Sequence, residues 1–560
     1  MKLYLAQQNY HIGNFEANTQ LILKAIAQAK ATQADIVVFS ELCVCGYPPR
    51  DFLTFPHFIT LCNNAIATIA SHTQGIAVVI GAPAANAIAE GKDLHNAAYF
   101  IANGKVVSIH HKTLLPTYDV FDEYRYFEPA YNWQTVTYKG VNIAITICED
   151  IWNLGDNPLY RICPMDKLME YKPQLMINLS ASPFDYTHNE DRRAIIKANV
   201  IKYKIPMVYV NAVGAQTDLI FDGESLVFDA EANLIKALPV FAEAYDEVTI
   251  NPDGTCAEPI LQANNTVPTA LLNPATLQAN AHIDYIYQAL ILGIQHYFTK
   301  MEFTKAIVGS SGGIDSAVTI ALAVAALGAS NVTAVLMPSE YSSSHSVSDA
   351  VQLSKNLGNP YHILPIASVY NSLLQTLEPL YTNTPFGVAE ENLQSRTRGN
   401  LLMGIANKHN FILLNTSNKS ELATGYGTLY GDMAGGLGIL GDVYKLQIIA
   451  LAKYINRNGE VIPTNIITKP PSAELRPNQK DSDSLPEYEV LDALLYQYIE
   501  QLQGPNEIIA QGFEPATVHR VLKLVNQNEY KRNQFCPILR ISPKAFGSGR
   551  RMPIVGKYLA

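Results

Sequence analysis

The sequence predicts two α/β domains joined by a linker, and three observations support this fold class. First, 560 residues exceed what one hydrophobic core usually organises, since single domains rarely grow beyond about 250–300 residues. Second, strand-length runs rich in Val and Ile recur in both halves and alternate with helical stretches. Third, apolar periodicity fades near the middle of the chain, where prolines interrupt a stretch rich in Asn, Ala and Thr. We therefore expect a domain over residues 1–250, a linker over residues 251–279 and a second domain over residues 280–560.

The first half begins with a strand, a helix and another strand. Residues 2–7 form a short apolar run, and the next apolar positions share one helical face. Several of the later runs lead directly into polar residues, so chemistry is expected at the strand ends. The further strands are expected at residues 36–40, 76–81, 105–109, 141–148, 175–179, 207–213 and 225–228.

The second half reads as a βαβ unit with a parallel sheet. A helix at residues 282–298 precedes a strand at 305–309, and a helix at 317–327 separates that strand from another at 332–337. A further strand is expected at residues 411–414.

The composition excludes several classes of protein. With 48% hydrophobic and 16% charged residues the chain is neither disordered nor fibrous. A net charge of −10 argues against nucleic acid as a partner. No apolar run is long enough to span a bilayer or act as a signal peptide, so we expect a cytoplasmic protein without membrane contact. Seven scattered cysteines favour reduced thiols, and the close pair Cys43 and Cys45 favours packing over zinc.

A glycine-rich loop follows the strand at residues 305–309. Adjacent glycines turn backbone N–H groups inward at a helix N-terminus, which forms a cradle for an anion. The loop lacks the lysine of a Walker A motif, and Asp315 stands there as a ligand suited to Mg²⁺. The alternative is an ordinary flexible turn. The loop residues expected to bind a nucleotide are Gly309, Ser310, Ser311, Gly312, Gly313, Ile314, Asp315 and Ser316.

The loop string Ser-Gly-Gly-Ile-Asp-Ser resembles the pyrophosphate-binding loop of the ATP pyrophosphatase superfamily. The resemblance implies a doubly wound parallel-sheet domain that splits ATP into AMP and pyrophosphate. The implied chemistry is adenylation, in which a substrate oxygen attacks the α-phosphorus.

A thiol, a carboxylate and an ammonium follow three predicted strands of the first half. They are Cys148 after residues 141–147, Glu41 after residues 36–39, and Lys112 after residues 105–109. A carboxylate can take the thiol proton, the thiolate can attack an amide carbonyl, and the ammonium can stabilise the oxyanion. Taken singly, the cysteine could be packing and the charges could be solvated surface.

The three strings, in this order, resemble the nitrilase superfamily with its Glu-Lys-Cys triad. That resemblance implies an α-β-β-α sandwich and a second glutamate, which would be Glu123.

A nitrilase-like amidase ahead of an ATP pyrophosphatase resembles the glutamine-dependent NAD synthetases. The implied last step of NAD biosynthesis takes L-glutamine, deamido-NAD and ATP, with Mg²⁺, to NAD, glutamate, AMP and pyrophosphate. It also implies that ammonia passes within the protein and that the chain forms a homo-oligomer.

The same resemblance assigns further contacts. Asp315 and Glu421 would bind Mg²⁺, and residues 475–486 would form a lid. The family usually has Lys or Arg at the position of His188, so Arg192 or Arg193 could receive the glutamine carboxylate, or glutamine affinity could be lower. The expected contacts are Thr416 for ATP, Asn392, Glu421 and Lys531 for deamido-NAD, and Tyr118, Ser182 and His188 for glutamine.

Two other amidotransferase classes share the nucleotide loop but not the nucleophile. Asparagine synthetases use an N-terminal cysteine, whereas this sequence begins Met1-Lys2, and GMP synthetases carry Gly-x-Cys-x-Gly, whereas Cys148 lies between Ile147 and Glu149. A regulatory module with a dead amidase would lack one of Glu41, Lys112, Cys148 or Asp315, and all four are present.

Overall fold

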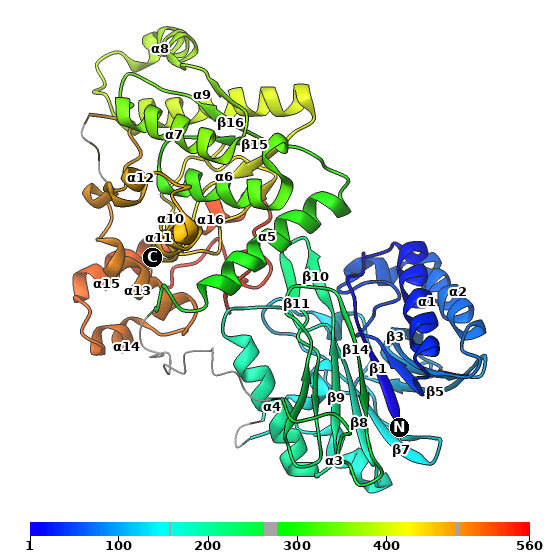
Figure 1. Cartoon of the computed structure of the whole chain (residues 1–560). Coiled ribbons are helices and arrows are strands. Elements are labelled where there is room, and N and C mark those ends of the chain that lie inside the picture. The colour runs from blue at the N-terminus through cyan, green and yellow to red at the C-terminus, as the bar shows by residue number, and fades with distance from the viewer. Residues whose placement is uncertain (156–157, 262–276, 478, 480, 560) are drawn as a thin grey trace. The chain divides into compact units, whose positions relative to one another are not determined.

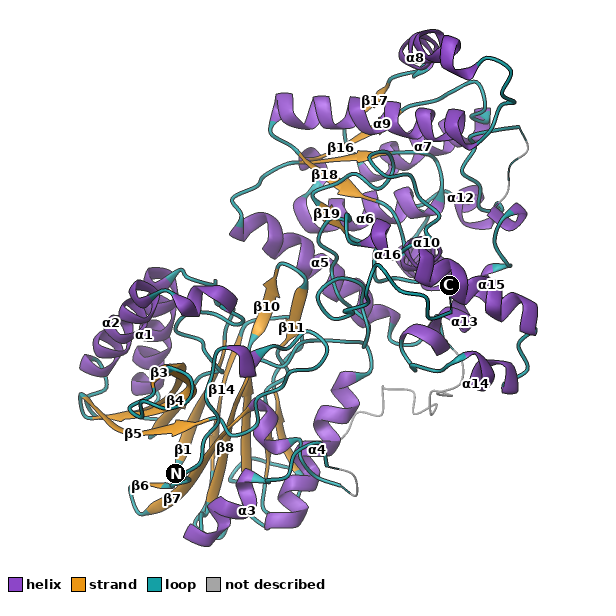
Figure 2. Cartoon of the chain, turned by 180° about the vertical axis from the view of Figure 1, so that it is seen from behind, coloured by secondary structure: helices purple, strands orange, loops and turns teal. Residues whose placement is uncertain are grey.

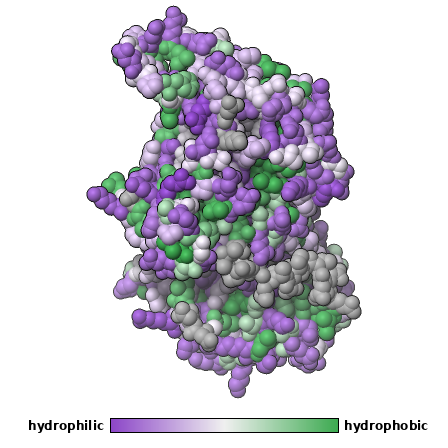
Figure 3. Space-filling view, turned by 90° about the vertical axis from the view of Figure 1, so that its left-hand side faces the viewer, coloured by the Kyte–Doolittle hydropathy of each residue, from purple (hydrophilic) through white to green (hydrophobic). Residues whose placement is uncertain are grey.

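A computed structural model describes residues 1–155, 158–261, 277–477, 479 and 481–559, except for the side chains of residues 188 and 189. The chain divides into two compact units, Met1–Val267 and Pro268–Ala560. Within the described residues, no helix combines the length and apolar character needed to cross a membrane. Hydrophobic residues on the face in Figure 3 lie in small groups among hydrophilic ones.

Unit 1 is an α-β-β-α sandwich of two six-stranded sheets (Figure 1). The first sheet has the order β14-β1-β2-β3-β4-β5, and the second β13-β12-β9-β8-β7-β6. The first comprises β1 (Lys2–Gln7), β2 (Ile36–Val38), β3 (Ala77–Ala85), β4 (Leu94–Ala102), β5 (Lys105–His111) and β14 (Ala244–Thr249). The second comprises β6 (Val136–Tyr138), β7 (Val141–Ile147), β8 (Leu175–Ser180), β9 (Met207–Asn211), β12 (Leu226–Phe228) and β13 (Leu234–Ala237).

Strand alternation explains the layers of unit 1. Successive side chains of a strand point to opposite faces, so each sheet buries both faces here. On β4, Ala98 and Phe100 join the core between the sheets, whereas Tyr99 and Ile101 pack toward the outer helices. The helices are α1 (Phe15–Ala31) and α2 (Pro56–Ser71) on the first sheet, and α3 (Pro164–Leu168) and α4 (His188–Tyr203) on the second. The strands β10 (Val213–Gln216) and β11 (Leu219–Asp222) form a separate antiparallel pair.

Unit 2 contains a parallel sheet with the order β17-β16-β15-β18-β19 (Figure 2). The strands are β15 (Ala306–Gly309), β16 (Val332–Leu336), β17 (Tyr361–Ile363), β18 (Ile412–Asn415) and β19 (Leu437–Gly438). The strand order reverses at β15, which is the pattern of a doubly wound sheet. Ligands of such sheets bind beyond the carboxyl ends of the strands at this reversal.

Helices cover both faces of that sheet. Helices α8 and α9 pack on one face through Tyr370 and Leu402, while α6 packs on β15 and β16 from the other face with α5 and α11 behind it. The helices are α5 (Ile283–Lys300), α6 (Ile314–Leu327), α7 (Ser344–Leu357), α8 (Ala367–Tyr381), α9 (Val388–His409), α10 (Lys419–Thr424), α11 (Lys445–Ile455), α12 (Thr464–Thr468), α13 (Tyr488–Ile499), α14 (Pro505–Ala510), α15 (Pro515–Gln527) and α16 (Glu529–Arg532).

The predicted fold class is confirmed, although several strands were not expected from the sequence. Strand β1 has the predicted bounds, and β7, β8, β15 and β16 agree within two residues. The strands not predicted from the sequence are β4, β6, β10, β11, β13, β14, β17 and β19. Residues 251–261 of the predicted linker lie within unit 1 and hydrogen-bond to β13 and β14, and residues 262–276 lie outside the described residues.

Candidate functional site

Lys112 lies between two carboxylates in the interior of unit 1. Its Nζ is 2.7 Å from Oε1 of Glu41 and 2.9 Å from both carboxylate oxygens of Glu123. The three side chains come from different segments, after β2, after β5 and in a short 3₁₀ helix, η2 (Glu123–Arg125). Lys112 is 0% exposed, Glu41 1% and Glu123 5%. The structure therefore brings these three predicted residues together.

Cys148 begins the 3₁₀ helix η3 (Cys148–Ile151) where β7 ends, and it is buried beside the same charges. Its φ of 41° is unusual for a residue with a Cβ, which marks a sharply turned backbone. Burial raises the pKa of the Cys148 thiol well above its usual range, Glu41 raises it further, and Lys112 opposes them. The thiol is therefore protonated at rest and needs a base.

The charge of Lys112 is maintained by its neighbours. Burial alone would lower the pKa of Lys112, but Glu123 and Glu41 outweigh burial and hold it well above the ordinary value. Burial also raises the pKa of Glu123, while Lys112 lowers it. Lys112 therefore stays protonated, and its ammonium lies beside the Cys148 thiol.

Asp150 ties the loop after Lys112 to the loop at Cys148. Its carboxylate accepts the backbone N–H groups of Thr113 and Leu114, at 3.0 and 2.9 Å, and that of Ile147 at 3.0 Å. Burial raises the pKa of Asp150 to about 6. These bonds fix the ammonium and the thiol relative to each other.

Two buried residues that the sequence reading missed contact this cluster. The amide of Asn96, on β4, donates to Glu41 and Glu123, and the hydroxyl of Tyr47 donates to Oε1 of Glu123 at 2.8 Å. Tyr47 lies a short distance after Glu41 in a run of apolar residues. Neither side chain belongs to a motif that could have identified it, and for Asn96 the strand that carries it was not predicted either.

The residues expected to contact glutamine differ in exposure and in their hydrogen-bond partners. Tyr118 is partly exposed and donates to Glu149, whose pKa burial raises to about 7. Ser182 is buried, and its backbone N–H donates to Asn211. His188 begins α4, but its side chain lies outside the described residues.

The two arginines considered as substitutes for the missing cation are both paired. Arg192 is fully buried and its guanidinium contacts Asp222 at 2.8 and 3.0 Å. Arg193 donates to Glu224 at 2.9 Å through Nε. Their charges are committed to carboxylates of unit 1, so neither is a free receptor for a substrate carboxylate.

In unit 2, the glycine-rich loop joins β15 to α6, where the sequence predicts an anion cradle. Gly312 has a φ of +78°, and a Cβ there would lie 2.2 Å from the backbone oxygen of Ser346. Ser311 Oγ accepts the N–H of Gly313, and Ser316 Oγ donates to the oxygen of Gly313. Only glycine fits at position 312, because the loop packs directly against the start of α7.

Lys445 is held between the two acidic side chains expected at the metal site. Its Nζ lies 2.6 Å from Oδ2 of Asp315 and 3.5 Å from Oε1 of Glu421. Asn418 also donates to Asp315, at 2.9 Å. Burial, followed by the charge of Asp315, raises the pKa of Glu421 to about 8.

These donors fit an Mg²⁺ ion that is bound jointly by protein carboxylates and by substrate phosphates. Mg²⁺ commonly binds one or two carboxylates together with substrate phosphates and water. Asp315 and Glu421 supply two carboxylates that already share one cation. Among the described residues, no group of three or more His, Cys, Asp or Glu side chains is placed to hold a metal ion alone.

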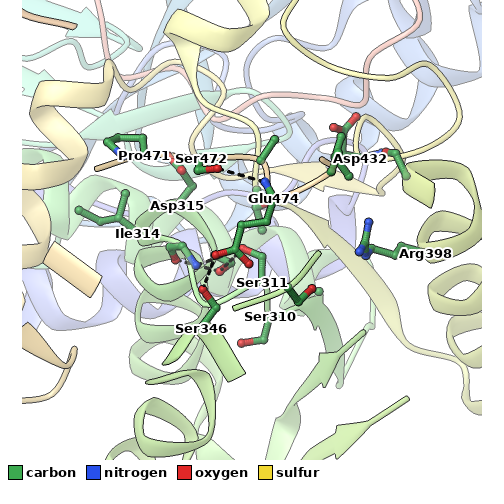
Figure 4. Close-up of a pocket in the computed structure, with 18 of the residues that line it drawn as sticks. Ser310, Ser311, Ile314, Asp315, Ser346, Arg398, Asp432, Pro471, Ser472 and Glu474 are labelled. Atoms are coloured by element: carbon green, nitrogen blue, oxygen red, sulfur yellow. Dashed lines mark hydrogen bonds between the residues drawn. The ribbon is translucent and has the colours of Figure 1, made fainter. Parts of the chain in front are cut away.

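A cavity of about 650 Å³ lies above the cradle, a size common for small-molecule sites (Figure 4). Residues 309–311 and 313–316 line it, together with Thr416, Arg398 and Lys445. The carboxylate of Glu474 points into the cavity toward Ser346 and Ser311. It accepts the hydroxyls of Ser343 and Ser346 at 2.9 and 2.8 Å, at the N-terminus of α7.

Asn392 and Lys531, which are expected to contact deamido-NAD, both hydrogen-bond to residues 425–428. Asn392 accepts the hydroxyl of Thr428 at 2.8 Å, and Lys531 donates to the backbone oxygens of Gly425 and Gly427 at 2.7 and 2.8 Å. Asn392 and Lys531 are not among the residues that line the cavity. The segment between them supplies Tyr426 to the cavity wall.

Comparisons with known proteins match each half of the chain to a family. Residues 3–255 match the carbon-nitrogen hydrolase family, and residues 286–535 match the NAD synthase family. The glutamine-dependent NAD(+) synthetase of Synechocystis sp. is 44% identical over 557 residues, which covers 98% of each chain. That of Acinetobacter baylyi is 40% identical and covers 99% of this chain and 98% of its own.

Solved structures show the same similarity over the whole length. A glutamine-dependent NAD+ synthetase from Acinetobacter baumannii in complex with ADP has a TM-score of 0.75 at 38% identity, covering 99% of this chain and 98% of its own. One from Cytophaga hutchinsonii has a TM-score of 0.80 at 21% identity, with the same coverage, and supports the fold.

Proposed function

The chain belongs to the glutamine-dependent NAD(+) synthetases, and from this membership we propose that unit 1 releases ammonia and unit 2 consumes it. The enzyme hydrolyses L-glutamine to glutamate and ammonia, and it amidates adenylated deamido-NAD to give NAD, AMP and pyrophosphate. We assign the glutaminase to residues 1–250, the synthetase to residues 280–560 and the linker to residues 251–279. The family matches over residues 3–255 and 286–535 support this division.

In the proposed glutaminase step, Glu41 removes the proton of the Cys148 thiol and the thiolate attacks the amide carbon of glutamine. The ammonium of Lys112 stabilises the oxyanion that forms on the amide oxygen. The proton then passes from Glu41 to the amide nitrogen, the C–N bond breaks and ammonia leaves a thioester on Cys148. Water hydrolyses the thioester to glutamate and restores the thiol. Glu123 holds Lys112 in place through two hydrogen bonds.

Tyr118, Ser182 and His188 are proposed to contact glutamine. The partly exposed Tyr118 and its partner Glu149 support this assignment for the polar end of the substrate. The pairing of Arg192 with Asp222 leaves His188 as the position from which the substrate carboxylate would be bound. A neutral imidazole is a weaker partner than a guanidinium, so a high KM for glutamine is expected.

In the proposed synthetase step, residues 309–316 bind the phosphates of ATP, and Thr416 contacts the same nucleotide from the end of β18. The nicotinate carboxylate oxygen attacks the α-phosphorus, pyrophosphate leaves, and ammonia then displaces AMP from the acyl carbon. Mg²⁺ bound by Asp315 and Glu421 would neutralise charge on the departing pyrophosphate. The inward N–H groups of the loop provide further stabilisation.

Asn392, Glu421 and Lys531 are proposed to contact deamido-NAD. Their support is the convergence of Asn392 and Lys531 on residues 425–428, one of which lines the cavity. We also propose a homo-oligomer, which analytical ultracentrifugation tests. Exposed apolar side chains around α8, including Leu380 and Val388, support a buried interface there.

The observation that carries the proposal is the burial of Lys112 between Glu41 and Glu123 beside Cys148, in a chain that also has a glycine-rich loop lining a cavity in unit 2. Cys148→Ala should abolish NAD formation from glutamine but leave formation from added ammonia intact. Cys62→Ala, at another buried cysteine of unit 1, is the matched control and should keep both activities. Loss of both activities in Cys148→Ala alone would refute the division into two sites.

A further inference from the structure

Asn96 is a neutral amide buried where the apolar core between the two sheets meets the charged cluster. It lies on β4, and strand alternation places its side chain on the same face as Ala98 and Phe100, between the two sheets of unit 1. Asn96 is 1% exposed. An apolar side chain would pack equally well on that face, so packing alone does not explain an amide at this position.

The amide nitrogen of Asn96 joins the two carboxylates of the site. Nδ2 donates to Oε1 of Glu41 at 2.7 Å and to Oε2 of Glu123 at 3.2 Å. Because ionised carboxylates only accept hydrogen bonds, this contact determines which end of the amide faces them. The amide oxygen has no hydrogen-bond partner among the described residues. The side chain is therefore placed for its two donors at the expense of its acceptor.

The backbone of Asn96 also positions Lys112. The backbone N–H of Lys112 donates to the oxygen of Asn96 at 2.8 Å, one residue beyond the end of β5. One residue of β4 thus fixes the main chain of the ammonium and the side chains of both its acidic partners. Glu41 is held at three points: Oε1 accepts from Asn96 and Lys112, and Oε2 accepts the N–H of Ala181 at 3.0 Å.

We propose that Asn96 is a positioning residue for glutamine hydrolysis, which aligns Glu41 with the Cys148 thiol and keeps Glu123 on Lys112. Asn96 does not touch the reacting atoms. This inference rests on the proposed role of Glu41 as the base. The titratable groups of the cluster and those that face it are Glu41, Glu123, Lys112, Tyr47, Cys148, Glu149 and Asp150.

The test is Asn96→Leu, which keeps nearly the same size and removes both donors. Glutamine-driven kcat should fall by about 100-fold, since a misplaced catalytic group costs roughly that factor. The acid limb of the pH profile of kcat/KM should move to higher pH, because carboxylates that lose donors hold their protons more tightly. Glutamine-driven kcat should fall further in Asn96→Asp, because this change adds a third acidic group to the cluster. Ammonia-driven synthesis should stay at the wild-type rate in both variants.

Asn18→Leu is the matched control. Asn18 is also buried in unit 1, but its amide donates to the backbone oxygens of His11 and Val44 rather than to a carboxylate. Asn18→Leu should lower the free energy of unfolding without shifting the acid limb of the pH profile of kcat/KM. If Asn96→Leu leaves both kcat and the acid limb as in the wild type, or if Asn18→Leu moves the limb equally, the inference is wrong.

Two further measurements separate this inference from the role of Glu41. Glu41→Gln should abolish glutamine-driven turnover, and wild-type turnover in that variant would refute Glu41 as the base, whatever Asn96 does. If Asn96→Leu does not fold, Asn96→Ser provides the test with a smaller residue. Alkylation of Cys148 by iodoacetamide, followed by peptide mass, should show slower labelling at neutral pH in Asn96→Ser. Unchanged labelling would refute the positioning role without depending on activity.

Discussion

The ammonium of Lys445 lies 2.6 Å from Asp315 and thereby occupies the acidic corner of the nucleotide cavity. The pair joins the first turn of α6 to the first turn of α11, two helices far apart in sequence. Both charges are needed if the loop is to bind an anion and a divalent cation together. Predictions for both units follow from pairings of this kind.

Lys445→Met should abolish ammonia-driven synthesis and lower the free energy of unfolding by about 2 kcal/mol. This value is below the roughly 3–5 kcal/mol of a fully buried broken pair, because Asp315 is partly exposed. Lys453→Met, at an exposed site on the same helix, is the control. Rate assays with ammonium chloride and thermal unfolding measure the two effects. Wild-type synthesis in Lys445→Met would contradict the prediction.

Gly312→Ala should prevent ATP binding. The new Cβ would lie 2.2 Å from the oxygen of Ser346, and the φ of +78° is strained for alanine. Gly328→Ala, at the end of α6, shares a positive φ but has no atom within 4 Å. Isothermal titration with ATP should show binding in the Gly328 variant only. Equal affinities in the two variants would show that the loop does not need the close approach to α7.

Lys112→Met should abolish glutamine-driven synthesis and destabilise the chain by roughly 3–5 kcal/mol, since two buried carboxylates lose their shared partner. Ammonia-driven synthesis should continue below the new unfolding temperature. Lys167→Met, which breaks an exposed pair with Glu170, should change stability by less than about 0.5 kcal/mol. Calorimetry distinguishes the two variants, and equal stabilities would argue against a buried ion pair at Lys112.

Acid should destabilise unit 1 partly through two neutral histidines. Burial lowers the pKa of His110 and of His111 to about 4, and the ring of His111 stacks on His95 with centroids 3.9 Å apart. Between pH 6.5 and 4 the unfolded chain therefore binds more protons than the folded chain, so this stability is present above pH 6.5 and is lost as pH falls.

Comparison with His110→Gln/His111→Gln isolates that contribution. Burial raises the pKa of Glu149 to about 7 and that of Asp150 to about 6, so these two groups add stability as pH falls over the same range. Their contribution is the same in the wild type and the variant, and it cancels when the two stability curves are subtracted. The unfolding temperature of the variant should fall less than that of the wild type between pH 6.5 and 4. Parallel curves would contradict the assignment.

Glu474→Gln should lower the apparent KM for ATP about fivefold, equivalent to ~1 kcal/mol for removing one like charge near the phosphates. In the structure its carboxylate takes hydrogen bonds from Ser343 and Ser346 that a phosphate could also accept. Glu489→Gln, at an exposed position on α13, is the control. An unchanged or higher KM in Glu474→Gln would show that this carboxylate does not compete with ATP.

The layers and the main charged cluster could be predicted because they depend on local patterns. A short apolar run marks β1, a run rich in Val and Ile marks β7, and Cys148 follows the second run directly. Asn96 could not be predicted, because its importance arises only when β4 pairs with β5 and brings it opposite Lys112. Lys445 likewise gains its role from helix packing that brings it 130 positions back along the chain to Asp315.

The three backbone hydrogen bonds of Asp150 have a consequence for how substrate reaches unit 1. The backbone N–H groups of residues 113, 114 and 147 all donate to this one carboxylate, which ties the segment after Lys112 to the segment that carries Cys148. Separating these two segments would break buried backbone hydrogen bonds and is therefore costly. We therefore expect glutamine to enter and glutamate to leave past segments that Asp150 does not bind. One such segment carries Tyr118, which has 44% of its area exposed.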